Sequence, residues 1–450
     1  MTALAALKAA RIAILGAGRE GQATYAWLRG KLKTKALTVI AESPADPEFV
    51  NRLERGDQLL VEPLCVERLR TFDVLIRSPG ISPYREPLSA ALDAGVRITT
   101  PSNLWFATHP TAKTICITGT KGKSTTSALV AHLLQSAGRQ VRLAGNIGLP
   151  LLACDDQDVD WWVIELSSYQ IADLEAEPTI AIILNFSPEH LDWHGSAELY
   201  WQDKLRLAAL TQQGVLIVNA SDVALAGHFA SATNVTWFNT FAGVHVVDKQ
   251  IYDRNIPLPV SMPAGLPGRH NLLNVAAALT AASVAGLDLQ QVARAVTTFT
   301  SLPHRLQVLG SRNGITYIND SIASTPVATV AALEALQDRP ILLILGGLDR
   351  GLDWSRYAAA ISMASTRAVI GMPASGPRII ETLRRAGIAP ASGFHHTPDL
   401  PGAVTLAQEL AQAGDTVLLS PGAPSFPQFI DFRERGQVFA RLCGFEAGAG

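Results

Sequence analysis

The chain has 450 residues, 48% of them hydrophobic and 17% charged, which is the composition of an ordinary globular protein and excludes a disordered one. At roughly 150 residues per domain, this length predicts about three domains. Lys and Arg number 37 against 39 Asp and Glu, a formal net charge of -2, so no overall positive field exists to attract nucleic acid or an anionic membrane. We therefore expect neither as a partner.

The cysteines are scattered without the spacing of a metal or redox site: they are Cys65, Cys116, Cys154 and Cys443. Such usage is typical of a reducing compartment. Residues 1–10 hold no apolar signal segment, and no run of about 18 apolar residues follows. These features predict a soluble, cytoplasmic protein.

Residues 11–15 predict a strand, which is followed by a G-x-G-x-x-G motif at the start of a helical pattern. The motif glycines are Gly16, Gly18 and Gly21. This order of strand, glycine turn and helix is typical of a turn that holds the pyrophosphate of a nucleotide. Glu42 ends the next strand, where dinucleotide-binding folds place a ribose-binding acid. A dinucleotide cofactor and another nucleotide are both open.

A later strand, 72–76, leads into a tight turn that contains Ser78, Pro79 and Gly80. Ligands of α/β sheets bind at the carboxyl ends of strands, so this turn is a second candidate contact for the nucleotide. Residues 96–100 predict the last strand of the unit. The first domain is thus a small nucleotide-binding α/β fold that ends near residue 105.

The central part begins with a phosphate-binding pattern, in which an apolar strand leads into a glycine loop and a helix starts at Lys123. The loop residues are Gly119, Thr120, Lys121 and Gly122. Backbone N–H groups of such a loop approach phosphate oxygens, Lys123 reaches the outer phosphates, and Ser124 or Thr125 can hold Mg²⁺. Ile117 stands where the common P-loop has its first glycine, so this loop is a shorter form. A surface turn is the alternative.

Further along, a carboxylate and a histidine follow buried strands. Glu165 closes an apolar strand, and a buried carboxylate is costly unless it is paired or binds a metal. A salt-bridged core residue and a Mg²⁺ ligand facing the phosphate loop are both open. His190 follows the apolar strand 181–185 and could ligate a metal. By composition, Lys204 on the helical pattern 197–210 is a solvated lysine.

Residues 222–256 are polar and irregular in pattern and predict no regular element. The next helical pattern ends near Leu279 and carries Asn271 and Asn274 in its first turn. Asparagines at that place can cap a helix, and their amides can also contact a purine base. Both interpretations are open.

Residues 301–305 have the pattern of a linker into a third unit. Its strand 314–320 ends in Asp320, and two further apolar strands, 339–347 and 416–419, are followed by loops rich in Asp, Arg and Ser. Strand ends with such loops predict a second, smaller Rossmann-like sheet that presents its loops to one site.

Together, these motifs resemble the Mur ligase family of peptidoglycan synthesis, whose members use ATP to add amino acids to a UDP-N-acetylmuramoyl carrier. The resemblance covers nearly the whole chain, and the first-domain glycines with the Ser78 turn are similar to the glutamate-adding members. Its motifs are residues 118–125, 145–148, 165–168, 190–192 with Lys204, 270–274, 302–305, 319–321 and 420–421.

The resemblance implies an α/β fold with three domains. These would be a Rossmann-like UDP-carrier domain at 1–105, a central P-loop ATP-binding domain at 106–302, and a Rossmann-like amino-acid-binding domain at 303–450. Family members transfer the γ-phosphoryl group of ATP to the carrier carboxylate, and an amine then displaces phosphate from the acyl phosphate.

The resemblance also implies roles for particular residues. The implied catalytic residues are Lys123, Glu165, His190 and Lys204. The implied ligands of two Mg²⁺ ions are Ser124, Glu165, His190 and a carbamate on Lys204, the lysine modification of this family. The implied ATP contacts are residues 119–125, Asn271, Asn274, Arg305 and Asp320. The implied carrier contacts are Gly16, Gly18, Glu42, Ser43, Ser78, Pro79, Gly80, Asn146 and Ser167. The first-domain glycines then seat the UDP pyrophosphate instead of a dinucleotide.

The amino-acid side is implied to use Ser324, Arg350, Ser425 and Phe426, and it departs from the D-glutamate-adding members. The segment after Asp320 lacks their lysine, and Arg350 replaces another lysine. Near the C-terminus, Pro424-Ser425-Phe426 with Pro427 replaces a more usual A-S-x-D motif. An arginine fork can bind a carboxylate bidentately where lysine offers a point charge. These changes favour L-glutamate as the substrate, with an epimerase acting later on the product. An ordinary D-glutamate ligase is the alternative.

Two other classes of protein share part of this pattern. A folylpolyglutamate-synthase-like ligase shares the phosphate loop and the modified lysine, but it starts near the ATPase core and lacks the extra N-terminal unit. A P-loop switch would need neither Lys204 and His190 nor a third domain. We therefore expect UDP-N-acetylmuramoyl-L-alanine and glutamate as the small-molecule partners of a monomeric enzyme.

Overall fold

The structure is a computed structural model that describes residues 3–154, 159–187, 189–263, 266, 268–300, 302–336, 339–363 and 365–446. Ser301, in the expected linker, lies outside these residues. Met1–Val260 with Leu273–Val296 form one compact unit, and Ser261–Leu272 with Thr297–Gly450 form a second.

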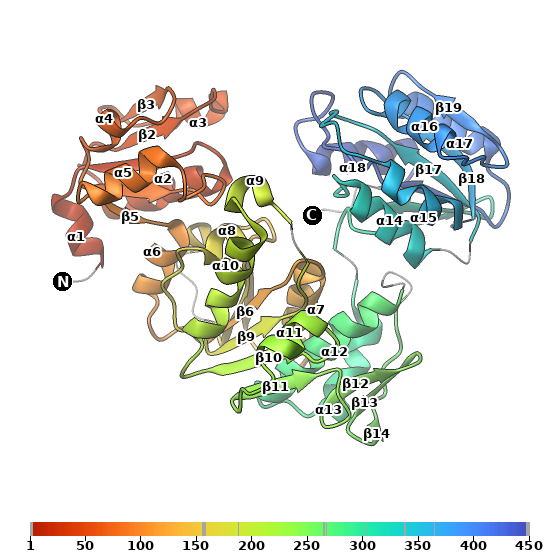
Figure 1. The fold of residues 1–450 in the computed structure, drawn as a ribbon, viewed down its shortest axis with the longest axis horizontal. Helices are drawn as coiled ribbons and strands as arrows, with labels where there is room; N and C mark the ends of the chain where they lie inside the picture. Colours follow the sequence, from red (N-terminus) through yellow and green to blue (C-terminus); the bar gives the residue numbers. More distant parts are fainter. Residues whose placement is uncertain are drawn as a thin grey trace. The chain divides into compact units, whose positions relative to one another are not determined.

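The first unit begins with a five-stranded parallel sheet in the order β3-β2-β1-β4-β5 (Figure 1). Its strands are β1 (Ile12–Leu15), β2 (Thr38–Ala41), β3 (Gln58–Val61), β4 (Val74–Arg77) and β5 (Arg97–Thr99). Its helices are α1 (Ala3–Ala9), α2 (Arg19–Lys31), α3 (Pro47–Asn51), α4 (Val66–Leu69), α5 (Glu86–Asp93) and α6 (Pro101–Thr108). Because β1 pairs with β4 in parallel, the glycine turn after β1 and the Ser78 turn after β4 lie at the same edge.

The second sheet of this unit has six parallel strands in the order β11-β10-β9-β6-β8-β7. Its strands are β6 (Thr114–Thr118), β7 (Val141–Gly145), β8 (Trp161–Glu165), β9 (Ile180–Ile183), β10 (Val215–Asn219) and β11 (Val235–Phe238). The helices of this part of the chain are α7 (Lys123–Ser136), η1 (Leu151–Ala153), α8 (Ser168–Ile171), α9 (Leu191–His194), α10 (Ala197–Leu210), α11 (Val223–His228), α12 (Arg269–Val284), α13 (Leu289–Val292) and η2 (Ala293–Thr298). β6 lies between β8 and β9, so the phosphate loop leaves the middle of the sheet.

The expectation of an irregular stretch at 222–256 is wrong. α11 and β11 lie in it, and β12 (Val244–Val247), β13 (Gln250–Asp253) and β14 (Ile256–Pro257) form a small antiparallel sheet. Each of these three strands has four residues or fewer and none is buried along its whole length, so no sustained apolar alternation marks them in the sequence.

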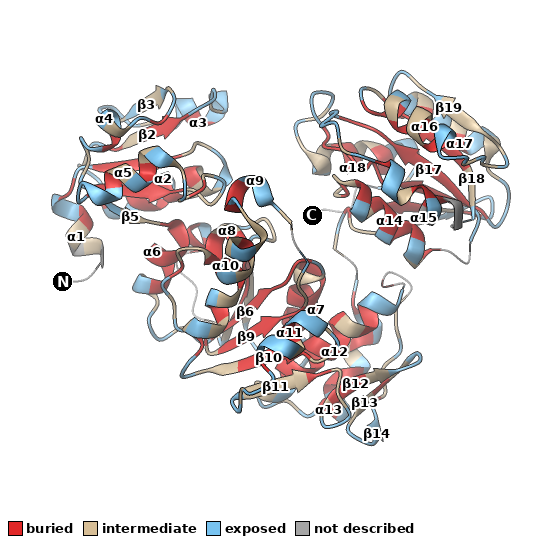
Figure 2. Cartoon of the chain, in the orientation of Figure 1, coloured by how far each residue is buried: buried red, intermediate tan, exposed pale blue. Residues whose placement is uncertain are grey.

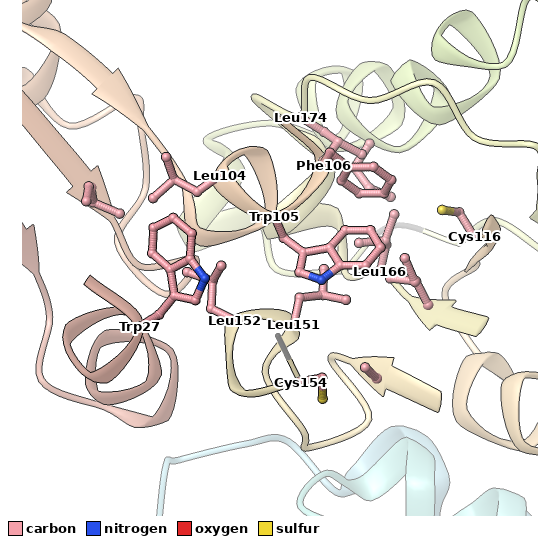
Figure 3. Close-up of a cluster of buried hydrophobic side chains, with 14 of the residues drawn as sticks. Trp27, Leu104, Trp105, Phe106, Cys116, Leu151, Leu152, Cys154, Leu166 and Leu174 are labelled. Atoms are coloured by element: carbon pink, nitrogen blue, oxygen red, sulfur yellow. The ribbon is translucent and has the colours of Figure 1, made fainter. Parts of the chain in front are cut away.

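The two sheets of the first unit share one hydrophobic core (Figure 3). Trp27 of α2, Leu104 and Trp105 of α6, and Leu151 of η1 all belong to it. Trp105 is fully buried, and its ring centroid lies 4.7 Å from that of Trp162 in β8. α6 therefore packs against both sheets.

The second unit contains a six-stranded sheet in the order β15-β16-β20-β17-β18-β19, in which only the β15–β16 pair is antiparallel. Its strands are β15 (Gln307–Arg312), β16 (Ile315–Asn319), β17 (Ile341–Leu345), β18 (Thr366–Gly371), β19 (Phe394–His396) and β20 (Thr416–Leu419). Its helices are α14 (Pro326–Ala335), η3 (Ser355–Tyr357), α15 (Ala358–Met363), α16 (Gly376–Arg385), α17 (Leu400–Leu410) and α18 (Phe432–Leu442).

Central strands of all three large sheets are buried at every residue, as β1, β4, β6, β9, β17 and β20 show (Figure 2). Strands covered on both faces are largely apolar, which is why these were the easiest elements to predict. No helix in the described ranges combines the length and the apolarity that a membrane crossing needs.

Candidate active site

The phosphate loop, residues 119–122, has a conformation that requires glycine at its first and last positions. Gly122 has φ +84°, a left-handed angle that costs other residues strain. A Cβ atom at Gly119 would lie 2.8 Å from the Cβ of Leu184, so the neighbouring strand end also excludes a side chain there. α7 begins immediately after Gly122, and its N-terminal N–H groups can therefore bind an anion in the loop.

Asn274 of α12 lies on this loop. Its Oδ1 accepts a hydrogen bond from Thr126 Oγ1 at 3.3 Å, and a Cβ atom at Gly122 would lie 2.4 Å from the same oxygen. α12 begins at Arg269, so Asn274 lies beyond its first turn and the capping interpretation fails for this residue. Asn271 is also buried. Their contacts with adenine stay a prediction.

Hydrogen bonds join the segment after β9 to the phosphate loop. Thr120 Oγ1 donates to the Ser187 carbonyl oxygen at 3.0 Å and accepts from the Ser187 N–H at 2.9 Å. Lys121 Nζ forms an ion pair with Glu189 at 2.6 Å. Lys123 Nζ donates to the carbonyl oxygens of Gly119 and Thr120 at 2.9 and 3.0 Å. The lysines and the segment that carries His190 thus belong to one site.

His190 stands at the start of α9 with φ +57°, and its ring centroid lies 5.1 Å from that of Tyr169. Partial burial lowers the pKa of His190, and the charge of Lys123 lowers it further, against the opposing charge of Glu189. The imidazole is therefore mostly neutral at pH 7, which is the form that binds a metal ion.

Glu165 is buried beside the phosphate-loop strand, because the register of β6 and β8 pairs it with Ile117. Its Oε1 accepts a hydrogen bond from Asn146 Nδ2 at 2.8 Å, whereas its buried Oε2 has no hydrogen-bond partner among the described residues. A buried carboxylate oxygen without a partner fits a cation ligand. This disfavours the alternative of a salt-bridged core residue.

A cation at Glu165 would draw most of its ligands from elsewhere. Within the described ranges, no three His, Cys, Asp or Glu side chains group into a metal cage. Mg²⁺ commonly binds one or two protein carboxylates and completes its shell with phosphate oxygens and water. The single free oxygen of Glu165 next to a phosphate loop suits that ion.

Lys204 is only 2% exposed, so the interpretation from composition alone, a solvated lysine, is wrong; the family resemblance had already replaced it. Its Nζ lies 5.0 Å from the centre of the Tyr200 ring. Burial lowers the pKa of Lys204 well below its ordinary value, and Lys123 lowers it further, while Glu189 opposes both. α10 packs against α8 and α9, and this packing, which the helix sequence does not show, removes the lysine from water.

The glycine turn and the Ser78 turn meet at the edge of the first sheet. A Cβ atom at Gly21 would lie 1.9 Å from the Gly16 carbonyl oxygen, and one at Gly16 would lie 3.0 Å from Ser78 Oγ. At Gly18 an added Cβ meets no described atom within 4 Å. Two glycines thus permit close packing, and the third leaves open space beside a helix N-terminus, where a pyrophosphate can bind.

Two other expected carrier contacts, Glu42 and Ser167, form hydrogen bonds within the protein. Both Glu42 oxygens bind the guanidinium of Arg85, at 2.6 and 2.7 Å. Ser167 begins α8 and forms a capping box with Gln170. Ser43 and Gly80 are exposed, and Pro79 is half-buried. The structure leaves their contacts with a carrier as predictions.

In the second unit, a small open pocket lies where β17, β18 and β20 end. Arg350 and Ser375 line it, and the Ser375 hydroxyl is buried without a hydrogen-bond partner among the described residues. Asp349 pairs bidentately with Arg378 at 2.6 and 2.7 Å, which fixes the loop that carries Arg350.

Asp320 directly follows β16, close to this edge, and is buried. It accepts hydrogen bonds from Ser420 Oγ at 2.8 Å and from the Leu306 N–H at 3.1 Å. Burial raises the pKa of Asp320 to about 7, although these hydrogen bonds and Arg305 oppose the shift. The remaining expected contacts are half-buried Ser324, buried Ser425 and exposed Phe426.

Two fully buried arginines, near the strand ends of the first and third sheets, were not among the predicted site residues. Arg77 closes the apolar strand β4, and a charged residue at the end of such a strand is the same signal that marked Glu165. Arg435 of α18 donates to the carbonyl oxygens of Ser321 and Ala423. Its helix pattern gives no sign of this burial.

Comparison with known proteins identifies two parts of the chain. Residues 117–282 match the Mur ligase middle domain, and residues 304–422 match the Mur ligase glutamate ligase domain. The chain is 42% identical to the UDP-N-acetylmuramoyl-L-alanine–L-glutamate ligase of Xanthomonas euvesicatoria, over 98% of this chain and 97% of that protein. The proteins of that name from Xylella fastidiosa and a Micromonospora species are 42% and 36% identical, over 98% and 99% of this chain and 97% and 99% of theirs.

Solved structures agree with the fold. UDP-N-acetylmuramate-alanine ligase from Thermotoga maritima superposes with a TM-score of 0.60 at 19% identity, over 97% of this chain and 99% of that one. MurF ligase from the same organism, in complex with ADP, gives 0.59 at 16% identity, over 96% and 93%. The fold, the two domain matches and the full-length relatives together show that the chain belongs to the Mur ligase family.

Proposed function

We propose that this chain is an ATP-dependent ligase that joins L-glutamate to UDP-N-acetylmuramoyl-L-alanine in the cytoplasmic synthesis of peptidoglycan precursors. The observation that carries the proposal is the match of almost the full chain, at 36 to 42% identity, to proteins named for this reaction. The phosphate loop, with Glu165 and Lys204 buried in the same unit, supports the ATP-dependent step.

In the first step, an oxygen of the carrier carboxylate attacks the γ-phosphorus of ATP, the bond to ADP breaks, and an acyl phosphate forms. The backbone N–H groups of the phosphate loop and the Lys123 ammonium would bind and orient the phosphates. Ser124, Glu165 and His190 would hold Mg²⁺, which neutralises charge between two anionic reactants. In the second step, the glutamate amine attacks the acyl carbon, loses a proton, and phosphate leaves.

Lys204 would take part as a carbamate. A neutral lysine amine can attack CO₂ and release one proton, which converts a cation into a carboxylate-like group. The lowered pKa of Lys204 supports this, because the neutral form is the nucleophile. Carbamylation would also relieve the repulsion between the two neighbouring lysine charges.

Residues of the second unit would supply contacts for the amino acid. Arg350 would bind a carboxylate of glutamate, with Ser324, Ser425 and Phe426 as further contacts, and its planar fork supports the preference for L-glutamate. Asn271 and Asn274 would contact adenine, and Arg305 and Asp320 would bind phosphate and ribose. The proposal also includes a monomeric enzyme and an epimerase that acts on the product.

The experiment is phosphate release with Mg²⁺, ATP and UDP-N-acetylmuramoyl-L-alanine, comparing L-glutamate with D-glutamate. We expect turnover only when the carrier and L-glutamate are both present. Turnover with D-glutamate alone would overturn the L-glutamate assignment. Release of phosphate without carrier or amino acid would overturn the ligase assignment.

Lys204→Ala should lower kcat on the order of 10²–10³-fold, because a metal-binding group next to the transferred phosphoryl is lost. Added short carboxylates should restore part of the rate by occupying the vacated place. Lys249→Ala, at an exposed lysine, is the control and should leave kcat unchanged. Full activity of Lys204→Ala would remove the carbamate from the mechanism.

A further inference from the structure

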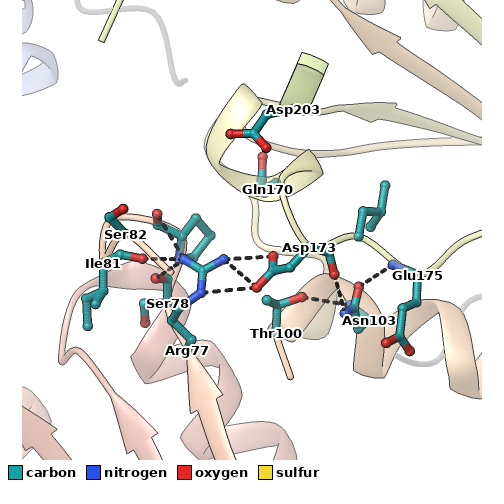
Figure 4. Close-up of polar contacts among 12 residues, drawn as sticks. Arg77, Ser78, Ile81, Ser82, Thr100, Asn103, Gln170, Asp173, Glu175 and Asp203 are labelled. Carbon is teal, nitrogen blue, oxygen red and sulfur yellow. Dashed lines mark hydrogen bonds and ion pairs between the residues drawn. The ribbon is translucent and has the colours of Figure 1, made fainter. Parts of the chain in front are cut away.

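Arg77 connects the two sheets of the first unit through a partly buried ion pair (Figure 4). It is the last residue of β4 and is fully buried. Its Nη2 lies 2.7 and 2.8 Å from the two carboxylate oxygens of Asp173, and its Nε lies 3.2 Å from one of them. Asp173 follows α8 of the second sheet, so the pair crosses from one sheet to the other.

The other side of the same guanidinium holds the turn Ser78–Ile81, which we call the carrier turn. Arg77 Nη1 donates to the carbonyl oxygens of Ser78, Pro79 and Ile81. Every nitrogen of the guanidinium therefore has an acceptor within the protein, and the side chain is fully buried, so a bound ligand would not reach it. It acts on a bound molecule only through the position of the turn.

Further contacts join the carrier turn to the segment that carries His190 and Lys204. Trp193 Nε1 donates to the Gly80 carbonyl oxygen at 3.2 Å, and Ser82 Oγ donates to the Trp193 carbonyl oxygen at 2.7 Å. Tyr84 donates to Asp203, the neighbour of Lys204, at 2.6 Å.

On the second-sheet side, the partners of Arg77 and Tyr84 are themselves held in place. His194 bridges Asp203 at 2.6 Å and Ser168 of α8 at 2.9 Å. Asn103 of α6 donates to the Asp173 carbonyl oxygen and accepts from the Glu175 N–H, both at 2.8 Å. The ion pair is thus bonded on both sides to firmly packed segments.

We propose that the Arg77–Asp173 pair positions the two sheets relative to each other. It would keep the place that binds the UDP end of the carrier at a fixed distance from the place that binds the reactive carboxylate. This inference rests on the proposed function. The carrier would bind the first sheet by its UDP group and would have to present its alanyl carboxylate to the phosphate loop of the second sheet. A ligand with two contact ends gains affinity only when both ends are held at the matching separation.

The test compares the dissociation constants of UDP and of UDP-N-acetylmuramoyl-L-alanine for the full chain, measured by titration calorimetry. On the proposed function UDP would contact the first sheet only, so the UDP constant divided by the carrier constant would measure what the rest of the carrier adds. Asp173→Ala is the main variant, because the Asp173 side chain is 30% exposed and Arg77 keeps its bonds to the carrier turn. Asp173→Asn is measured as well and replaces it should the alanine variant not fold.

We expect the dissociation constant of UDP divided by that of the carrier to fall at least tenfold in Asp173→Ala. The dissociation constant of UDP itself should stay within twofold of wild type. The matched control is Asp73→Ala, which removes the partner of Arg11 from a pair of similar geometry within the first sheet, at 2.8 and 3.2 Å. The control should keep the wild-type ratio.

Two results would overturn the positioning role while leaving the ligase intact. One is an unchanged ratio in a folded Asp173 variant, and the other is an equal weakening of UDP and carrier, which would mean that the pair only shapes the first sheet. A wild-type chain that binds the carrier no more tightly than UDP would instead overturn the proposed function, and the inference with it.

Discussion

Lys204 and Asp320 carry opposite charges in water, yet burial favours the neutral form of both side chains. Burial lowers the pKa of Lys204 and raises the pKa of Asp320 to about 7. The consequences differ with the chemistry: a neutral amine can react with CO₂, whereas a protonated carboxyl can donate a hydrogen bond. Glu165 is equally buried, but there one oxygen has a partner and the other has none among the described residues.

The raised pKa of Asp320 predicts how the stability of the chain depends on pH. The folded-state pKa of about 7 lies above the ordinary value of 3.8, so the folded protein binds the proton more tightly than the unfolded chain. The stability that this group contributes is therefore complete below about pH 4 and is lost as the pH rises to about 7. The loss is at most on the order of 4 kcal/mol, from about three pKa units.

Asp320→Asn should remove this dependence. Between pH 4 and 7, the unfolding free energy of wild type should decrease relative to that of the variant, measured by urea unfolding at each pH. Asp349→Asn is the control, because Arg378 lowers the pKa of Asp349 to about 2 and that group titrates only below pH 4. Parallel curves for wild type and Asp320→Asn would contradict the prediction.

Among the elements, those defined by local pattern were predicted almost to the residue. The helix α10 and the strand β20 have the expected bounds, and α7 begins at the expected Lys123. The three short strands β12, β13 and β14 were missed, because their pairing comes from neighbours and not from an apolar run.

The features of the candidate site also divide into those that local sequence predicts and those that depend on packing between distant parts of the chain. The phosphate loop and Glu165 follow from local sequence, since a glycine loop between strand and helix and a charge at the end of an apolar strand are visible without a structure. The burial of Lys204 depends on packing between helices, and the pairing of Arg77 with Asp173 joins residues far apart in the chain. No local pattern contains that information.

α12 comes close to the phosphate loop, so a side chain added at Gly122 should weaken ATP binding. Gly122→Ala would place a Cβ atom 2.4 Å from Asn274 Oδ1 and impose a φ of +84° on alanine. The loop or α12 must shift, so the dissociation constant of ATP should rise at least about tenfold, since left-handed strain alone costs roughly 1–2 kcal/mol.

Gly138→Ala separates the effect of left-handed backbone strain from the effect of the contact with Asn274. Gly138 has a similar φ of +78° after the end of α7, but an added Cβ meets no described atom within 4 Å. This variant should lose about 1 kcal/mol of stability and bind ATP as wild type does. Equal ATP binding by both variants would show that contact with Asn274 does not shape the loop.

Over the whole molecule, the hydrophobic cores indicate which parts can fold alone. The two clusters that cover the faces of the third sheet contain only residues between 306 and 445. The first sheet has one cluster of its own but shares the other with the second sheet. The expected boundary at 105 falls inside α6, whose Trp105 packs against the second sheet.

These cores predict that residues 303–450 fold as an isolated fragment, whereas residues 1–105 do not. The C-terminal fragment has a single tryptophan, Trp354, which is 1% exposed, so its fluorescence should keep a buried emission and show one cooperative thermal transition. In residues 1–105, Trp27 and Trp105 lose their partners in η1 and β8, and we expect no cooperative transition by circular dichroism. Residues 1–302 restore those partners and should unfold cooperatively. A cooperative transition in residues 1–105 would mean that the core shared by the two sheets is dispensable, and the Arg77–Asp173 pair would then join two independently stable domains.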